Sequence, residues 1–457
     1  MKKAVALVIA LALLSCGALA EERSFALNRD WTSDIYTWDG ERLTQPDTYI
    51  SIYSITGGET APEEELFNAQ STKQELPKDG EYASPRYAIL DWEGNLLTDF
   101  KYDSVEYSPT ADVLIYSIDG LFGAMTRSLE ELVPCKYDSV APDGEGGFIM
   151  VAHSSASAPN VLHMKKGGKP KATGVKARFY WGGMTEGLLS ANDAEGYYGF
   201  LNGQGHWAIK PTFEWAQSFT GGYSIVRQKG KTGVIDKTGK WTVKPTYDDD
   251  RGILSDGSAA ILLRGTRAYF VRPSDGKPLF SLRLTKDGYV TIGPEKSVIA
   301  VTDKGKTTLY DNQGKELLSL TDSYSFDLWS TQPEDRLLAT SFNTGILMDM
   351  KGEKLYEGQG LNYLDTVDGR ALYTVSRYKT RMVTYQGDDK EYEEPIYETY
   401  RYGIVDSDGN QLLPMVYRQL YQLIPGRYFA QDAQKWGVID ADGKWIVSGS
   451  LYDQLMD

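Results

Sequence analysis

One stretch of the chain combines a Gly-Lys-Thr triplet with three consecutive aspartates, residue types that bind phosphates and metal ions. It is GKTGVIDKTGKWTVKPTYDDD, residues 230–250. A phosphate-binding loop needs a further glycine five residues before the Gly-Lys pair, because its backbone amides surround the phosphates ahead of a helix. Ile225 stands at that position for Gly230, and the other Gly-Lys pairs fit no better. The stretch therefore does not predict a phosphate site.

A second candidate is DSDGN, residues 406–410, which places side-chain oxygens at alternate positions as a calcium-binding loop does. That loop also requires a glycine and a later glutamate, where this chain has Gln411 and Tyr417. The segment is therefore predicted to be a turn. The aspartates at 248–250 are predicted to begin a strand and to continue into a solvated loop.

The other reactive residue types lack partners at a useful spacing. His153, His163 and His206 have no Glu or Cys spacing that makes a zinc site. No Gly-x-Ser-x-Gly elbow occurs, and Cys135 lies in a predicted strand, which favours a buried structural thiol. We predict no catalytic, cofactor-binding or metal-binding residues and no enzymatic activity. The ligand-binding residues stay unassigned.

The charge of the chain limits its partners. Its 457 residues include 48 Lys and Arg against 63 Asp and Glu, a net charge of −15. Nucleic acid and anionic lipid are both bound by clustered Lys and Arg, so the balance argues against either partner. No segment after the N-terminus is apolar enough to cross a membrane.

The N-terminus resembles a bacterial-type secretory signal peptide. Lys2 and Lys3 precede an apolar run over 4–14, and Ala18-Leu19-Ala20 fits a small-x-small cleavage site. We expect residues 1–20 to be removed and the protein to be secreted or associated with the cell envelope. The alternative is a lipoprotein anchored through Cys16, since LLSC at 13–16 resembles a lipoprotein box.

A repeat accounts for the glycines and aspartates of the opening stretch. The best copies have a glycine inside an apolar segment, then Asp or Asn, and a second glycine six residues after the first. An aromatic residue recurs fourteen residues after the first glycine, or fifteen after Gly437, and is commonly followed by an acid. The anchors are Ala88 (in place of glycine), Gly123, Gly199, Gly233, Gly403 and Gly437, with weaker copies near Val161 and over 269–276, 308–314 and 346–352. A period of about 36 residues indicates a propeller, an array or a solenoid.

Each copy is predicted to be a β-hairpin with additional short strands. Alternation in Trp241-Thr242-Val243 has the period of a strand, and Gly239 supplies the positive φ of the hairpin loop. Asp236 can bond the amides of that loop. Gly233, inside a strand, predicts a bulge or the close approach of a neighbouring ring.

These residues resemble the WG repeat family, whose namesake pair survives here as Trp436-Gly437. The family pattern matches 233–248 and 435–447, and the resemblance extends from about Tyr87 to the C-terminus with decay in the middle. The resemblance implies an all-β interaction scaffold in exported bacterial proteins. Tyr, Phe or Thr replaces the namesake Trp in most copies, so the packing of each unit must differ.

The predicted fold class is all-β, with tandem hairpin repeats forming a β-propeller-like ring. The alternative is an open β-solenoid or superhelix. The chain ends in LYDQL, residues 451–455, a strand that elsewhere opens the next unit and could complete the first blade. The predicted organisation is a signal peptide at 1–20, a lead-in segment at 21–47 and the repeat array at 48–457.

Two inserts interrupt the repeat. Residues 57–84 are polar and acidic and are predicted to be a surface loop, and residues 377–401 are predicted to be a long protruding hairpin. Either insert could carry function or be a tolerated surface excursion. We expect a non-catalytic scaffold that binds another protein at or outside the cell envelope. The alternative is a carbohydrate- or cell-wall-binding module that uses exposed members of the 31 Tyr and 10 Trp.

Overall fold

The computed structural model shows an all-β protein. It describes residues 24–450 except 30–31, 47, 57–63, 73–85, 180–182, 293–297, 322–323, 328–335, 342–343, 350, 368 and 385–390. The chain forms two compact units, and each is described by itself. Unit 1 combines Met1–Asp138 with Tyr417–Asp457, and unit 2 is Ser139–Val416.

Unit 1 contains strands from both ends of the chain, and neighbouring strands are antiparallel. The first sheet comprises β1 (Ser24–Arg29), β2 (Thr32–Thr37), β3 (Tyr49–Ser54), β4 (Leu66–Ser71) and β5 (Tyr87–Asp91). It is followed by β6 (Ser104–Ser108), β7 (Val113–Ile118), β8 (Leu121–Met125) and β9 (Glu131–Pro142), whose last residues belong to unit 2. The last sheet comprises β37 (Gln419–Ile424), β38 (Arg427–Gln431), β39 (Lys435–Asp440) and β40 (Trp445–Ser450).

Unit 2 is a succession of short antiparallel sheets in chain order. Its first strands are β10 (Phe148–Ala152), β11 (Asn160–Met164), β12 (Lys171–Lys176), β13 (Leu188–Asn192), β14 (Tyr198–Asn202) and β15 (Trp207–Phe213). Two four-stranded sheets follow: β16 (Trp215–Ala216), β17 (Tyr223–Gln228), β18 (Lys231–Asp236) and β19 (Trp241–Tyr247), then β20 (Asp249–Ile253), β21 (Ala260–Arg264), β22 (Arg267–Val271) and β23 (Pro278–Arg283).

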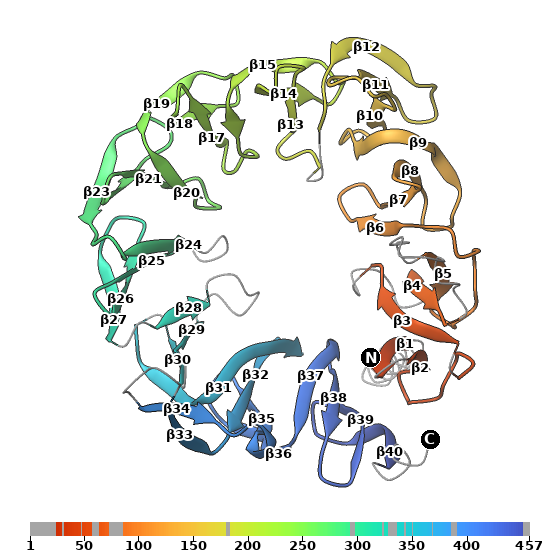
Figure 1. Ribbon diagram of the computed structural model, residues 1–457, viewed down its shortest axis with the longest axis vertical. Coiled ribbons are helices and arrows are strands. Elements are labelled where there is room, and N and C mark those ends of the chain that lie inside the picture. The colour runs from red at the N-terminus through yellow and green to blue at the C-terminus, as the bar shows by residue number, and fades with distance from the viewer. Residues whose placement is uncertain are drawn as a thin grey trace, which may run out of the picture. The chain divides into compact units, whose positions relative to one another are not determined.

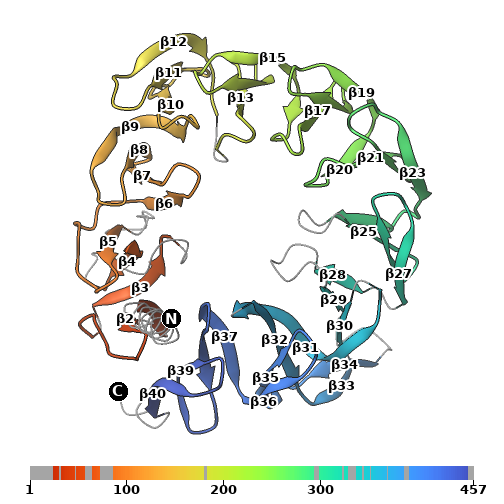
Figure 2. The same cartoon turned by 180° about the vertical axis from the view of Figure 1, so that it is seen from behind.

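The rest of unit 2 continues this arrangement. The next sheet has β24 (Tyr289–Ile292), β25 (Val298–Asp303), β26 (Lys306–Asp311) and β27 (Glu316–Thr321). The last has β28 (Ser325–Asp327), β29 (Arg336–Thr340), β30 (Gly345–Asp349), β31 (Lys354–Val367), β32 (Arg370–Arg377), β35 (Arg401–Asp406) and β36 (Gln411–Tyr417). In both views of unit 2, the final strands β15, β19, β23 and β27 lie on the outer side of the row of sheets (Figures 1 and 2).

The core lies between successive sheets, which explains why the strands are apolar on both faces. Adjacent residues of one strand enter different clusters: Ile225 packs toward β20–β22, whereas Val226 packs toward β13–β15. The pleat sends consecutive side chains to opposite faces, so a strand buried on both sides reads as a continuous apolar run. Four-stranded antiparallel sheets repeated in this way are the blades of a β-propeller-like fold, as the sequence predicted.

The glycine inside the repeat at 233 marks a bulge, as predicted. The pairing of β18 with β19 shifts register between Thr232 and Val234. A Cβ built on Gly233 would lie 2.5 Å from the carbonyl oxygen of Val243 and 2.7 Å from the ring of Trp241. Only glycine fits where a backbone and a ring approach so closely.

In three units the acid after the repeat aromatic caps the following turn, a role that was not predicted from the sequence. Glu214 accepts a hydrogen bond from the amide of Gly230 at 2.8 Å, and Asp248 accepts one from Gly265 at 2.9 Å. Asp103 binds Gly120 in the same way. These glycines have positive φ angles, so the turns are fixed by backbone geometry and by a carboxylate from the preceding unit.

Unit 1 joins the two ends of the described chain. Phe25 and Leu27 of β1 share a buried cluster with Phe429 and Trp436 of the last sheet. Arg427 lies 3.5 Å from the centroid of the Trp38 ring and donates a hydrogen bond to the Trp38 carbonyl. The ring closure predicted from the sequence stays a prediction, because its strand at 451–455 lies outside the described residues.

Two boundaries from the sequence analysis need correction. The insert at 57–84 is not a loop throughout, because residues 66–71 form β4 with Leu66, Phe67 and Ala69 buried. The lead-in segment at 21–47 supplies β1 and β2, which extend the first sheet beyond the predicted start at residue 48. The signal peptide at 1–20, including Cys16, lies outside the described residues.

Candidate functional site

The residues of the Gly-Lys-Thr stretch are all engaged in the frame. Gly230 occupies the turn between β17 and β18, and Lys231 pairs with Asp248 at 2.7 Å. Asp249 lies 3.0 Å from Arg251, and Asp250 accepts a hydrogen bond from Gln217. Burial and the neighbouring Asp249 raise the pKa of Asp250. These contacts account for the three aspartates without a ligand.

The turn at 406–410 is held by its own carboxylate. Asp406 Oδ1 accepts hydrogen bonds from the amides of Asp408 at 3.0 Å and Asn410 at 2.8 Å. Asp236 makes the same two bonds in its repeat, to Thr238 and Lys240. Within the residues that the structure describes, no group of three or more His, Cys, Asp or Glu could hold a metal ion.

Cys135 and the three histidines lie in separate surroundings in the structure. The Cys135 thiol is half-buried and donates to the Leu121 carbonyl at 2.9 Å, and burial raises its pKa. His163 lies 2.9 Å from the buried carboxylate of Asp143, whereas His153 and His206 are exposed. The sequence predicted a buried structural thiol in a strand, and Cys135 lies in β9 but is only half-buried.

The insert at 377–401 forms a hairpin with a two-stranded sheet of its own. Its strands are β33 (Thr380–Thr384) and β34 (Glu391–Pro395), which pair only with each other among the described strands. The flanking strands β32 and β35 pair directly with each other, so the hairpin leaves the sheet between them. At its base the Ile396 amide donates to the Lys379 carbonyl at 2.8 Å.

Four tyrosines form a row of nearly parallel rings at the base of this hairpin. The ring centroid of Tyr400 lies 4.4 Å from Tyr378, 6.0 Å from Tyr397 and 5.9 Å from Tyr402, with interplanar angles of 19°, 14° and 27°. Tyr397 begins a single 3₁₀ turn, η2 (Tyr397–Thr399), and residues three apart eclipse in such a turn. Tyr400 and Tyr402 share a face because they are two apart in extended chain.

The hairpin also carries the most exposed apolar side chains of the described chain. Tyr397 is 76% exposed and Met382 is 57% exposed, more than any other large hydrophobic residue described. Burial and the surrounding phenols raise the pKa of Tyr400, so its hydroxyl stays protonated. Arg401 donates to the carbonyls of Glu398 and Tyr400, and Arg381 lies 3.6 Å from Glu394. We name Tyr378, Tyr397, Tyr400 and Tyr402, together with Met382 and Arg381 of the hairpin, the tyrosine platform.

Most other aromatic residues serve the frame. Trp241 packs edge-on against Phe213 between two sheets, and Trp436 is 8% exposed. The other exposed aromatic residues in the described chain are dispersed: Tyr53, Tyr197, Trp215, Tyr289 and Tyr421. The insert was predicted from the sequence as a candidate for function, but the platform was not. Its signal in the sequence was the density of tyrosines at both ends of the insert.

A family model described as "WG containing repeat" matches residues 198–231 and 233–261. These segments contain the glycine bulge, the aspartate turn and the acid that caps the next turn. The chain contains WG repeats. The matched WG repeats cover β14 to β21, and the neighbouring sheets use the same turn chemistry at Asp311 and Asp349. No curated protein matches the chain by sequence.

Solved structures similar to this chain have low sequence identity. A eukaryotic initiation factor is 13% identical, with 78% of this chain and 96% of that chain covered and a TM-score of 0.42. BamB from Moraxella catarrhalis is 17% identical, with 67% and 91% covered and a TM-score of 0.31. AztD from Citrobacter koseri is 12% identical, with 64% and 91% covered and a TM-score of 0.30.

Proposed function

We propose that this protein is a non-catalytic, exported scaffold that binds another protein at or outside the cell envelope, and that the tyrosine platform is the binding surface. The observation that carries the proposal is the exposure of Tyr397 and Met382 on a hairpin outside the sheets. Aromatic residues, Met and Arg are enriched at protein interfaces, and Tyr gives large contact area at low entropic cost. Export is proposed from the signal-like N-terminus.

The packing of the sheets supports this function, because the residues that could be reactive serve the structure of the sheets and turns. The turn aspartates, the bulge glycines and Cys135 all have structural partners within the sheets. The strands that flank the hairpin, β32 and β35, bury Tyr373, Val375 and Val405 in one apolar cluster, and a well-packed support lowers the entropic cost of binding through a protruding element. The matched WG repeats also support a role as a repeat scaffold for binding, without indicating the partner.

A second candidate is binding of cell-wall carbohydrate, which the parallel tyrosine rings favour. A sugar ring can stack on an exposed aromatic face. In this row, however, the faces of Tyr400 are turned toward its neighbours, and Tyr397 at 76% exposure is the open member. One open ring offers a glycan chain a single stacking position. Met382 and Arg381 are residue types enriched at protein interfaces, so the surface favours a protein partner.

The experiment places a photo-crosslinking phenylalanine analogue at Tyr397 in the producing cells. A matched control carries it at Tyr289, which is 44% exposed and lies on β24, outside the hairpin. We expect a discrete protein adduct from position 397 that is absent from position 289. The adduct is expected to disappear when Met382→Asp is added.

The same proteins are sedimented with purified peptidoglycan and applied to a glycan array. No adduct at position 397, together with saturable glycan binding lost in Tyr397→Ala, would replace the proposed function with the carbohydrate alternative. Equal adducts at both positions would show that the platform has no special role.

A further inference from the structure

Unit 2 contains a basic surface that the net charge of the chain conceals. Residues 146–185 contain no Asp or Glu, although the whole chain has 63 acids against 48 bases. The hairpin of β11 and β12 and the residues joining them carry five lysines. They are Lys165, Lys166, Lys169, Lys171 and Lys176, and we name them the lysine hairpin.

All five lysines are exposed, and none has a carboxylate within ion-pair distance in the described part of the chain. Some cations elsewhere in unit 2 do pair, as Lys231 does with Asp248 and Arg336 with Asp408. The acids that flank the region along the chain are Glu186, which pairs with Lys237, and Glu145, which is exposed; Asp143 is buried and bonded to His163. The lysine hairpin therefore keeps a local positive charge in an acidic protein.

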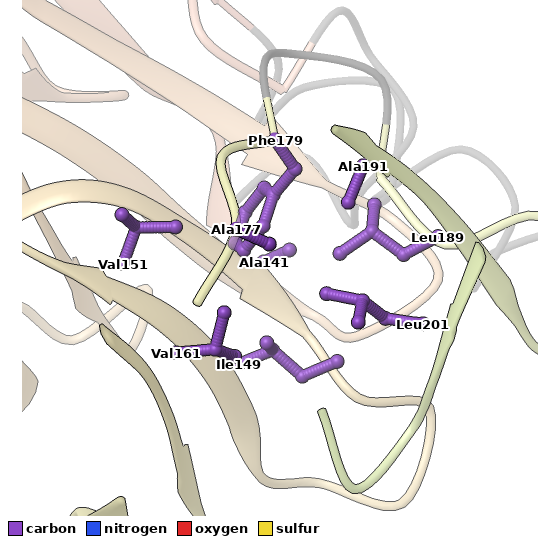
Figure 3. Close-up of a cluster of buried hydrophobic side chains, with 9 residues drawn as sticks. All are labelled: Ala141, Ile149, Val151, Val161, Ala177, Phe179, Leu189, Ala191 and Leu201. Carbon is purple, nitrogen blue, oxygen red and sulfur yellow. The ribbon is translucent and has the colours of Figure 1, made fainter. Parts of the chain in front are cut away.

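The backbone that carries these lysines is firmly held. The Gly168 amide donates to the Lys165 carbonyl at 2.8 Å, and Thr173 Oγ1 donates to the Val161 carbonyl at 3.0 Å. Val161 belongs to a cluster that also contains Ile149 and Leu201, shown in Figure 3. The lysine stems thus start from a fixed hairpin, while their ammonium groups remain mobile.

Protection of a sheet edge does not explain where the lysines lie. Lysine on an edge strand discourages pairing with another chain. The outer strands β15 and β19 achieve this with one lysine and one proline each, for example Lys244 and Pro245 in β19. In the lysine hairpin, Lys165, Lys166 and Lys169 lie between the strands, where there is no edge to protect.

The chemistry of the surface favours carboxylates over phosphates. Phosphate sites typically use the forked guanidinium of Arg or converging backbone amides. The one arginine of this region, Arg178, donates to the carbonyls of Ser154, Ala156 and Ser157. Lysine ammonium groups are compact point charges on flexible stems, suited to carboxylates spaced along an extended chain.

The shape of β12 favours contact through side chains. Its pairing with β11 is regular at Lys171 and Ala172 and then shifts before Lys176, with Gly174 at φ +80°. A bulged edge is a poor template for strand addition. The strand from Lys171 to Lys176 is roughly 20 Å long, the length of an extended peptide of about six residues.

We propose that the lysine hairpin binds an acidic, extended segment of a partner protein. The inference rests on the proposed function in taking a protein as the ligand, but it assigns a surface distinct from the tyrosine platform. Such a contact adds electrostatic attraction and orientation to the partner's engagement.

The test uses the full chain and fluorescein-labelled decaglutamate, followed by fluorescence anisotropy. The variant is Lys165→Ser, Lys166→Ser and Lys169→Ser together. The control is Lys244→Ser, Lys306→Ser and Lys315→Ser, which removes three exposed lysines of unit 2 and changes the net charge equally. We expect about tenfold weaker binding in the variant, little change in the control, and weaker binding to both proteins as salt rises to about 0.5 M.

Polyphosphate and vesicles containing phosphatidylglycerol are measured in parallel. Tighter binding of either to the lysine hairpin would overturn the proposal in favour of a phosphate-bearing ligand. Equal losses in variant and control, or no binding by the unmodified chain, would also overturn it. These outcomes are distinguishable from failure of the proposed function, which is read from the adduct at position 397. Circular dichroism melting of both triple variants checks that each is folded.

Discussion

The matched WG repeats and the hairpin at 377–401 use the same residue types for different purposes. In the repeats, Tyr247 packs against Tyr269 inside unit 2 and Asp248 caps a turn. In the hairpin, tyrosines stack on one another and leave Tyr397 exposed. The comparison teaches that residue type alone does not separate frame from site in this protein. What separates them is whether the next sheet covers the side chain.

The largest effect is expected where two backbones nearly touch. Gly233→Val puts methyl groups where a Cβ alone would lie 2.5 Å from the Val243 carbonyl. We expect the free energy of unfolding to fall by about 3 kcal/mol or more, measured by urea denaturation. Gly230→Ala is the control, because a Cβ there meets nothing and only the positive φ opposes it, at a cost of about 1 kcal/mol. Equal losses would contradict the close-approach explanation.

Next in size is the contrast between a core residue and a platform residue. Leu262→Ala removes a fully buried side chain from the cluster between two sheets, and we expect a loss of about 3 kcal/mol. Met382→Ala, at 57% exposure, is expected to change the free energy of unfolding by less than about 0.5 kcal/mol. A large loss from Met382→Ala would show that the platform belongs to the frame.

A smaller, pH-dependent effect is expected at Asp143. Burial raises the pKa of this carboxyl, but hydrogen bonds from His163 and from the amides of Glu145 and Gly147 outweigh burial and hold the pKa below its usual value. The stabilisation is therefore present above about pH 4 and is lost as the pH falls through the folded-state pKa.

Asp143→Asn is expected to be less stable than the unmodified chain by about 1–2 kcal/mol at pH 6. The difference should shrink below about pH 4, because the unmodified carboxyl then becomes protonated and loses its advantage. Urea denaturation at several pH values measures it. A difference that is the same at pH 3 and pH 6 would contradict the assignment.

The smallest effect is expected from removing the hairpin itself. The Lys379 carbonyl and the Ile396 amide are hydrogen-bonded, so Gly-Gly can replace residues 380–395 without separating β32 from β35. We expect the unfolding free energy to change by less than about 1 kcal/mol, with the protein adduct at position 397 lost. A deletion that lowers the unfolding free energy by several kcal/mol would contradict the assignment of the hairpin to binding and not to the stability of the sheets.

The repeat could be predicted because its signals are local. Glycine bulges, aspartate turns and alternating strands depend on residues within one unit, and the structure reproduces them at Gly233 and Asp236. β4 was missed because Leu66 and Phe67 sit in a polar, acidic stretch, and strands distant in sequence bury them. The tyrosine platform was missed because Tyr378 and Tyr400 come from opposite ends of an insert.

The cluster joining β1 to the last sheet has a consequence for biogenesis. Phe25 emerges from the ribosome some four hundred residues before Phe429, its partner in that cluster. Sheets in between can fold from contacts close in sequence, whereas the opening strands must wait for the final ones, so their apolar faces stay uncovered during that interval. Removing β1 or the last sheet therefore exposes the same apolar cluster, and an exposed apolar surface favours aggregation.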